Sequence, residues 1–250
     1  MKKILCLDFD GVICDSIQEC LLTSYIAYQG FINGDVVVDK CMTIPENIKD
    51  SFLQHRYLVR PAKQYGMLQH MLHNKDSISA EEFTKSCNDY RFPMNEYEPL
   101  FFQVRAELIS SDLSYWLNLN NVYPHVLKHW TSITTQIPTY IVTNKNYNSV
   151  TILLDHFKLN FNKDNIFSKE ITGSKADALI TLAKHHNINF DKIIFIDDNS
   201  EYIKEMLDLG IKAYLAHWGY ERFNNKSYIL KKEELIKEFG DIYGIINKIN

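Results

Sequence analysis

The 250-residue sequence lacks any apolar run near the roughly 20 residues that a membrane-spanning helix needs. It also lacks long basic or acidic runs, and its formal net charge is −4. We therefore expect neither a nucleic-acid-binding nor a membrane-binding surface. The opening Met1-Lys2-Lys3-Ile4-Leu5 superficially resembles a secretion signal, but Asp8 and Asp10 interrupt the apolar stretch too early for one.

Paired-cysteine patterns are absent as well. The five cysteines are odd in number, lie in the first half of the chain and form no Cys-x-x-Cys pair. This usage favours a cytoplasmic protein with free thiols. There is no internal repeat and no low-complexity segment. A hydrophobic content of 46% is enough for one sizeable core and a smaller second domain.

Three short apolar runs each end at a polar residue. They are Lys3-Ile4-Leu5-Cys6-Leu7 before Asp8, Tyr140-Ile141-Val142 before Thr143, and Ile193-Ile194-Phe195-Ile196 before Asp197. Runs without alternation predict strands buried on both faces of a parallel sheet. The carboxyl ends of such strands open onto the crevice where ligands bind. We expect one site there to collect aspartates, a hydroxyl and a lysine, which suits phosphoryl transfer with magnesium.

Helical and strand patterns alternate after residue 122. Helices are expected at about His125–Ser132, Asn148–Phe157, Lys175–His186 and up to Leu209, strands at Ile166–Phe167 and Lys212–Ala216, and a charged terminal helix from about Lys231. This alternation predicts an α/β fold, a Rossmann-like parallel sheet covered by helices.

The segment between the first and second apolar runs has helical spacing and no convincing strand. Its expected helices lie around Ile48–His73, Ser79–Tyr90 and Glu98–Leu117. We therefore predict a catalytic core made of residues 1–16 and 122–250, and an inserted all-α domain of residues 17–121.

Four motifs occur in a fixed order: Asp8-Phe9-Asp10-Gly11, Thr143, Lys175, and Asp197-Asp198. In that order they resemble the haloacid dehalogenase superfamily, and within it the magnesium-dependent phosphatases with a helical cap of the C1 type, similar to phosphoglycolate phosphatases. The resemblance implies a cap that closes over the site and excludes water. It also implies hydrolysis of a small phosphorylated metabolite.

The resemblance assigns roles to the first motif and to the groups that hold the phosphoryl group. Asp8 is the expected nucleophile, which forms an aspartyl-phosphate, and Asp10 is the general acid and base. Gly11 permits a tight turn that brings backbone N–H groups toward phosphate oxygens. Thr143, the neighbouring Asn144 and Lys175 would bind the transferring group.

The same resemblance implies a Mg²⁺ site made of hard oxygen ligands. We expect Asp8 and Asp198 to bind the ion directly, the backbone carbonyl of Asp10 to complete the protein's share, and Asp197 to act through water. One departure concerns this site. A second acidic residue often follows the last motif by four positions, and this chain has Tyr202 there. Glu201 or Asp197 could compensate.

Cations in the insert could meet a second anionic group of the substrate, although each alone is more often a solvated surface residue. They are Arg56, Arg60, Lys63, Arg91 and Arg105. Arg56 and Arg60 are spaced four apart and would share one helix face, so we favour them as substrate contacts.

The sequence leaves several functions open. A phosphomutase would keep the same core residues. A phosphonate hydrolase would need a lysine of the insert poised for a Schiff base. Asp10 argues against a dehalogenase. A protein that binds a phosphorylated ligand without catalysis is the alternative of a different class, although Asp8 and Asp10 are both retained. Substrate identity and oligomeric state stay open.

Overall fold

The computed structural model describes residues 3–75, 77–221 and 235–248. The chain divides into two compact units, one made of Met1–Asp15 with Asn121–Asn250 and the other of Ser16–Asn120. We call the first the core unit and the second the helical unit. None of the described helices is long and apolar enough to cross a membrane.

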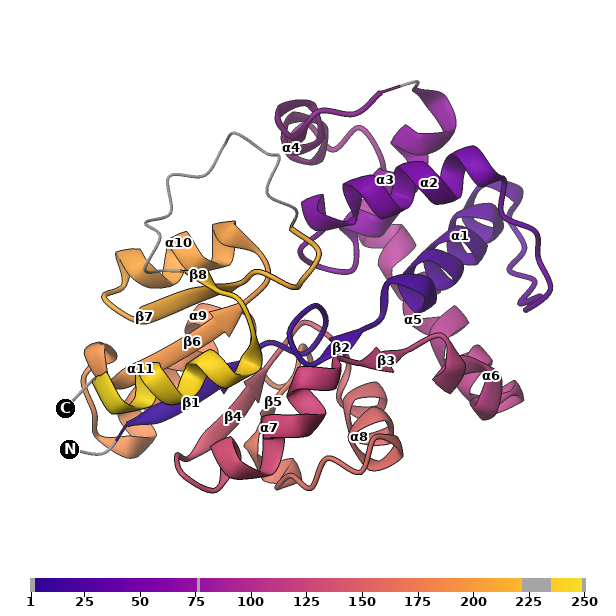
Figure 1. Ribbon diagram of the computed structural model, residues 1–250. Helices are drawn as coiled ribbons and strands as arrows, with labels where there is room; N and C mark the ends of the chain where they lie inside the picture. The colour runs from indigo at the N-terminus through magenta and orange to yellow at the C-terminus, as the bar shows by residue number, and fades with distance from the viewer. Residues whose placement is uncertain (1–2, 76, 222–234, 249–250) are drawn as a thin grey trace. The chain divides into compact units, whose positions relative to one another are not determined.

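The core unit is built on a six-stranded parallel sheet in the order β5-β4-β1-β6-β7-β8 (Figure 1). Its strands are β1 (Ile4–Leu7), β4 (Thr139–Val142), β5 (Ile166–Phe167), β6 (Ile193–Asp197), β7 (Lys212–Ala216) and β8 (Leu235–Ile236). Strands β1, β4 and β6 are buried along their whole length, as unalternated apolar runs predict. The predicted Rossmann-like α/β fold is confirmed.

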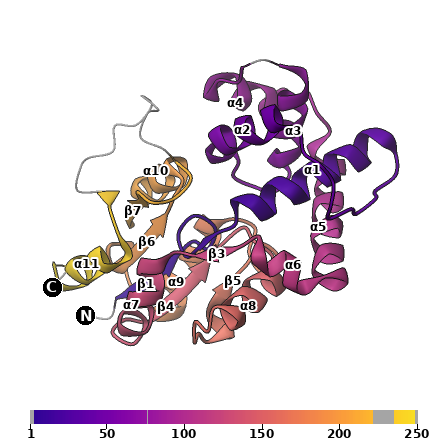
Figure 2. The same cartoon turned by 45° about the vertical axis from the view of Figure 1, so that its right-hand side comes forward.

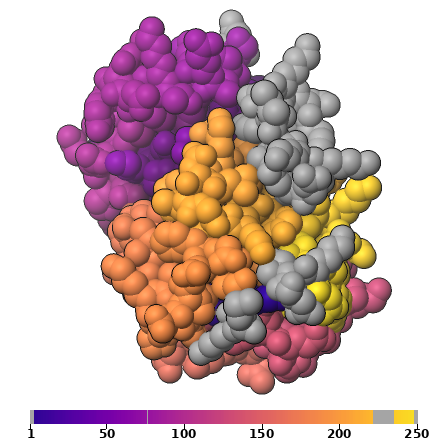
Figure 3. All heavy atoms as spheres, turned by 90° about the vertical axis from the view of Figure 1, so that its left-hand side faces the viewer, coloured from indigo at the N-terminus to yellow at the C-terminus, as the bar shows by residue number. Residues whose placement is uncertain are grey.

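Helices cover both faces of this sheet. The helices of the core unit are α7 (Pro124–Thr134), α8 (Tyr147–His156), α9 (Lys175–His186), α10 (Ser200–Asp208) and α11 (Ile242–Lys248), with 3-10 turns η2 (Lys163–Asn165), η3 (Phe190–Lys192) and η5 (Phe239–Asp241). Leu179 of α9 and Ile203 of α10 pack with Cys6 and Phe195 of the strands. Helices α7 and α11 lie in front of the sheet in Figure 1. The outer faces of α9 and α10, in orange, are at the surface in Figure 3.

The strand order positions the site. From β1 the chain continues to β4 and β5 on one side, and then returns to β6, β7 and β8 on the other. Leu7, the last residue of β1, pairs with Ile141 of β4 and with Ile196 of β6. The carboxyl ends of three strands therefore meet at the point where the order reverses, which is where open α/β sheets bind ligands.

The chain leaves and re-enters the core unit through a short antiparallel ribbon. Strand β2 (Cys14–Asp15) pairs with β3 (Asn121–Val122). At the far end of the chain, Lys231, where we expected a terminal helix to begin, lies outside the described residues. Residues 235–248 form a strand, a 3-10 turn and the short helix α11 instead of one long helix.

The described residues of the helical unit contain helices and no strand (Figure 2). The helices are α1 (Ile17–Asn33), α2 (Glu46–His55), α3 (Gln64–Asn74), α4 (Ala80–Asn88), α5 (Met94–Ser111) and α6 (Leu113–Asn118), with the 3-10 turn η1 (Arg56–Leu58) after α2. The single helix expected at about Ile48–His73 was wrong. Pro61 lies between α2 and α3, and a proline disfavours the helical conformation of the residue before it.

Helices α1 and α5 are joined by a buried ion pair. The Arg105 guanidinium donates to both oxygens of the Glu19 carboxylate, with Nε–Oε1 at 2.7 Å and Nη2–Oε2 at 2.9 Å. Thr23 Oγ1 donates to the same carboxylate at 2.9 Å. Because both charged residues are almost completely buried, Arg105 is not the solvated surface cation that we considered.

Candidate active site

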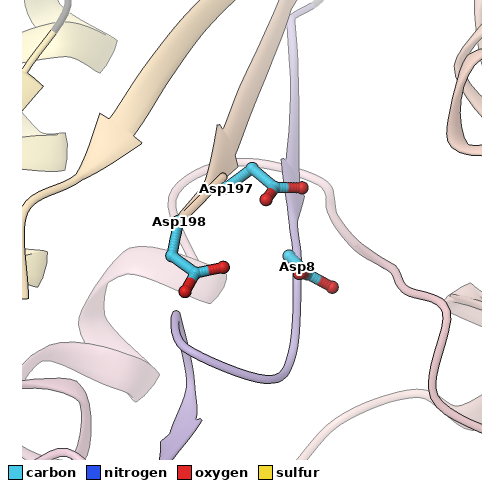
Figure 4. A group of neighbouring side chains, drawn as sticks. All are labelled: Asp8, Asp197 and Asp198. Atoms are coloured by element: carbon cyan, nitrogen blue, oxygen red, sulfur yellow. The ribbon is translucent and has the colours of Figure 1, made fainter. Parts of the chain in front are cut away.

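Three carboxylates meet at the carboxyl ends of β1 and β6 (Figure 4). Asp8 directly follows β1, Asp197 ends β6, and Asp198 comes next. One oxygen of each side chain lies within 4.8 Å of the other two, and all three residues are buried. The sheet register accounts for this, because Asp8 N–H donates to the carbonyl of Ile196 at 2.9 Å and so continues the β1–β6 ladder.

A tight turn after Asp8 brings the backbone close to Asp198. Gly11 has φ +81°, a conformation that residues with a side chain rarely adopt. A Cβ atom at Gly11 would lie 2.1 Å from Asp198 Oδ2, and one at Gly219 would lie 2.2 Å from Asp198 Cβ. Tyr220 N–H donates to Asp198 Oδ2 at 2.7 Å. The Asp198 side chain therefore lies between the backbone at Gly11 and the backbone at Gly219, and a side chain at either position would clash with it.

Lys175 is the buried cation of this cluster. It is the first residue of α9, and its Nζ lies 2.9 Å from Asp8 Oδ2 and 2.6 Å from Asp197 Oδ2. Burial alone would lower the pKa of Lys175, but the carboxylates of Asp197 and Asp8 outweigh it and hold the pKa above its ordinary value. Lys175 is therefore a fixed positive charge beside Asp8.

A second buried lysine was missed from the sequence. Lys145 Nζ lies 3.1 Å and 3.3 Å from the two carboxylate oxygens of Asp10, and its side chain is fully buried. Lys145 follows Asn144 in the segment after β4, so the motif around Thr143 could have drawn attention to it. Its partner, however, is 135 residues away in the sequence.

The predicted phosphoryl-binding residues also come from the strand ends. Thr143 N–H donates to the carbonyl of Phe167, and Thr143 Oγ1 accepts the Lys145 backbone N–H at 3.2 Å. Asn144 Nδ2 donates to the hydroxyl of Tyr202 at 2.8 Å. Burial raises the pKa of Tyr202, so its hydroxyl stays protonated at neutral pH.

Glu221 is a further buried acid that the sequence analysis missed. Its carboxylate accepts the backbone N–H of Ser200 at 2.6 Å and the Ser200 hydroxyl at 2.9 Å. These bonds fix the start of α10, directly after Asp197 and Asp198. Glu221 therefore supports the loop that carries the two aspartates. No local pattern predicts a contact between residues 21 positions apart.

The donor set suits a divalent cation. Four carboxylates (Asp8, Asp10, Asp197 and Asp198) and two ammonium groups (Lys145 and Lys175) give this site a formal charge of −2. Asp8 Oδ1 is buried and has no hydrogen-bonding partner among the described residues. A buried carboxylate oxygen without a partner is costly unless something binds it. Mg²⁺ prefers oxygen ligands, and its charge of +2 would balance the formal charge of the site.

The two favoured arginines of the insert do not share a helix face. Helix α2 ends at His55, Arg56 lies in the 3-10 turn, and Arg60 lies beyond it. Arg56 is buried, donates to the carbonyl of Val59 at 3.1 Å, and has its guanidinium 5.0 Å from the ring centre of Tyr65. The spacing argument for these residues was therefore wrong, and their contact with substrate stays a prediction.

Comparison with known proteins gives a match in structure. No family model matches the sequence, and no curated protein matches it. Solved structures match over nearly the whole chain. A predicted phosphoglycolate phosphatase from Haemophilus somnus is 16% identical, with a TM-score of 0.65 and 98% of each chain covered. A predicted phosphatase from Clostridium acetobutylicum is also 16% identical, with a TM-score of 0.64 and 99% of each chain covered.

A haloacid dehalogenase-like hydrolase from Streptococcus pneumoniae matches with a TM-score of 0.54 at 15% identity, over 89% of this chain and 88% of its own. The chain has the haloacid dehalogenase-like fold. The fold implied by the four motifs is thus confirmed. At this identity the likeness shows the haloacid dehalogenase-like fold alone, so activity has to be argued from the site.

Proposed function

We propose that this protein is a Mg²⁺-dependent phosphatase that hydrolyses a small phosphorylated metabolite through an aspartyl-phosphate. One observation carries the proposal: Asp8, Asp197 and Asp198 converge with Lys175 at the strand ends, and one oxygen of Asp8 has no hydrogen-bonding partner in the part of the chain that the structure describes. A buried carboxylate beside a fixed positive charge is suited to attack an electrophile that is itself anionic.

In the proposed reaction, a carboxylate oxygen of Asp8 attacks phosphorus, and the bond from phosphorus to the leaving oxygen breaks. Asp10, which takes part in this step as the carboxylic acid, gives its proton to that oxygen and becomes a carboxylate. It then takes a proton from the water that attacks the aspartyl-phosphate, which releases inorganic phosphate and restores both Asp8 and the acid form of Asp10. The Lys175 ammonium and the Thr143 hydroxyl would hold phosphoryl oxygens, and Asn144 would support them.

The metal would be held by the carboxylates of Asp8 and Asp198 and the backbone carbonyl of Asp10, with Asp197 acting through water. When bound, Mg²⁺ supplies positive charge that offsets the repulsion between the Asp8 carboxylate and the phosphoryl group. Lys175 already neutralises part of the negative charge of Asp8 and Asp197, which fits an indirect role for Asp197.

The test is release of inorganic phosphate from p-nitrophenyl phosphate and from a panel of phosphorylated metabolites, with and without Mg²⁺. We expect turnover that requires the metal and falls at least about 1,000-fold in Asp8→Asn, because the amide is not a nucleophile. The matched control is Asp191→Asn, which removes an exposed carboxylate outside the site and should keep wild-type rates.

Undiminished turnover in Asp8→Asn would refute the mechanism. Folded, Mg²⁺-loaded wild-type protein that hydrolyses nothing in the panel would refute the phosphatase proposal. Separation of the products then distinguishes the alternatives, since a phosphomutase gives an isomeric phosphate and a phosphonate hydrolase gives phosphate from a carbon–phosphorus bond.

A further inference from the structure

Tyr202 occupies an unexpected place in the candidate site. It lies in the first turn of α10, four residues after Asp198. Its ring centre is 4.3 Å from Lys175 Nζ. Its hydroxyl accepts the hydrogen bond from Asn144 Nδ2 at 2.8 Å. One rigid side chain thus contacts two residues that come from different segments of the core unit.

The contact with the Tyr202 ring restricts the position of the Lys175 ammonium. Lys175 Nζ is already paired with Asp8 and with Asp197, and the face of Tyr202 lies against it as a third neighbour. A cation over an aromatic face is attracted most strongly when water is excluded, and Lys175 is 4% exposed. The ring therefore restricts the directions that the ammonium can take.

The hydrogen bond to the Tyr202 hydroxyl orients the side-chain amide of Asn144. Asn144 directly follows Thr143 after the end of β4, and its side-chain amide reaches the hydroxyl of Tyr202. The hydrogen bond to Tyr202 selects one orientation of the amide. Because the tyrosine ring is rigid, the positions of Lys175 and Asn144 are set together.

Glu201 and Asp197 are the acids that we considered as substitutes for a carboxylate at the position of Tyr202. The side chain of Glu201 is exposed. Asp197 accepts hydrogen bonds from Lys175 at 2.6 Å and from the Asn199 backbone N–H at 3.0 Å. The first turn of α10 therefore directs an aromatic ring, and not an anion, toward the cluster.

We infer that Tyr202 is a positioning residue for the phosphoryl-binding side of the site: it fixes Lys175 with its ring and Asn144 with its hydroxyl. The divalent cation is then held without a carboxylate from this turn of α10. The effect on turnover rests on the proposed function, whereas the effects on the lysine and on phosphate binding do not.

Two variants separate the contacts. Tyr202→Phe keeps the ring and removes the hydroxyl, and Tyr202→Leu removes both. Tyr90→Leu is the matched control, because Tyr90 is 68% exposed in the helical unit. Circular dichroism melts establish that each variant is folded. Three quantities are measured for each: the NMR shifts of the Lys175 ε-methylene, the Kd for inorganic phosphate with Mg²⁺ present, and the Kd for Mg²⁺ alone.

We expect the ring current of Tyr202 to shift the Lys175 ε-methylene protons upfield in the wild type and in Tyr202→Phe, and the shift to be lost in Tyr202→Leu. Phosphate should bind roughly 3- to 10-fold more weakly in the Phe variant, for one lost hydrogen bond, and more weakly again in the Leu variant. The Mg²⁺ Kd should stay within about twofold in both. For the phosphatase substrate, KM should rise with the phosphate Kd.

A tenfold or larger loss of Mg²⁺ affinity in Tyr202→Leu, with phosphate affinity unchanged, would overturn the inference, because Tyr202 would then serve the metal. Unchanged Lys175 resonances in Tyr202→Leu would overturn it as well. Should Tyr202→Leu not fold, Tyr202→Phe, Asn144→Ala and their double variant form a thermodynamic cycle on phosphate affinity. Additive losses in that cycle would contradict the link between the two residues. A wild-type protein without turnover would refute the proposed function and not this inference, because the NMR and binding measurements do not require turnover.

Discussion

The replacement of Arg105 by methionine is the sharpest stability test that the structure offers. The wild-type guanidinium makes a two-point contact with the Glu19 carboxylate, at 2.7 Å and 2.9 Å, and neither side chain is more than 4% exposed. Methionine keeps much of the apolar length and removes the charge. The change leaves a buried carboxylate with the Thr23 hydroxyl as a remaining donor.

The size of the effect follows from that uncompensated charge. Removing one partner of a buried ion pair costs about 3–5 kcal/mol of unfolding free energy. Arg105 also stacks on Phe101, with its guanidinium 4.6 Å from the ring centre, and methionine preserves part of that contact. The loss should be smaller at pH 5 than at pH 8, because the unpaired Glu19 carboxylate can take up a proton and lose its charge.

Hydrogen exchange followed by mass spectrometry measures this loss within the helical unit. The amides of α1 and α5 should lose on the order of 100- to 1,000-fold of their protection in Arg105→Met, the exchange equivalent of about 3–4 kcal/mol. Amides of β6 in the core unit provide an internal reference. The control variant is Arg91→Met, which breaks an exposed ion pair with Asp89 and should cost less than about 1 kcal/mol.

A second variant distinguishes charge from packing. In Glu19→Met with Arg105→Met, both charges of this pair are removed together, so most of the lost protection should return. A single variant as stable as the wild type would refute our account of this ion pair. So would a double variant that is no more stable than Arg105→Met alone, because the cost would then come from lost packing.

Two further predictions concern the core unit. Lys145→Met should lower kcat/KM for p-nitrophenyl phosphate on the order of 10- to 100-fold, because Asp10 loses the ammonium that positions it. Lys145→Arg should recover part of the loss. Lys192→Met, which removes a half-buried lysine paired with Asp191 outside the site, should have no effect. Equal rates in Lys145→Met and the wild type would contradict the role of that ion pair. Burial lowers the pKa of His125, whose Nδ1 accepts the Phe239 backbone N–H at 3.1 Å. The unfolded chain therefore binds this proton more tightly, and the unfolding free energy should fall as the pH drops below about 6.5. Urea unfolding at pH 5.5 and 7.5 measures the fall, which should be smaller in His125→Gln; an equal fall in both proteins would count against this assignment.

The strand ends could be predicted because burial on both faces leaves a local signal. An unalternated apolar run that stops at a polar residue marks where a parallel strand meets the site. Asp8, Thr143 and Asp197 were found in this way, and the structure places all three at strand ends. The adjacency of Asp8 and Asp197 depends on the strand order, which the sequence analysis did not predict and which the folded sheet shows.

The parts that were missed depend on contacts distant in sequence. Lys145 pairs with Asp10, and Glu221 holds Ser200. A lysine or glutamate in a loop has the same local pattern whether it is solvated or buried, so only the folded chain shows the difference. The helical unit was misjudged for another reason. The apolar spacing continues through residues 56–63, and it hid the break that Pro61 imposes.

Because β2 and β3 pair with each other, the inserted residues between them could be deleted or exchanged by mutagenesis. Asp15 and Asn121 face each other in its register, so their Cα atoms are about 5 Å apart. A two-residue Asn-Gly turn spans such a pair in an antiparallel hairpin. Residues 16–120 could thus be excised and replaced by two, or exchanged for the insert of another protein, without lengthening the connection. Both ends of the insertion therefore adjoin a single residue pair, Asp15 with Asn121, of the β2–β3 ribbon.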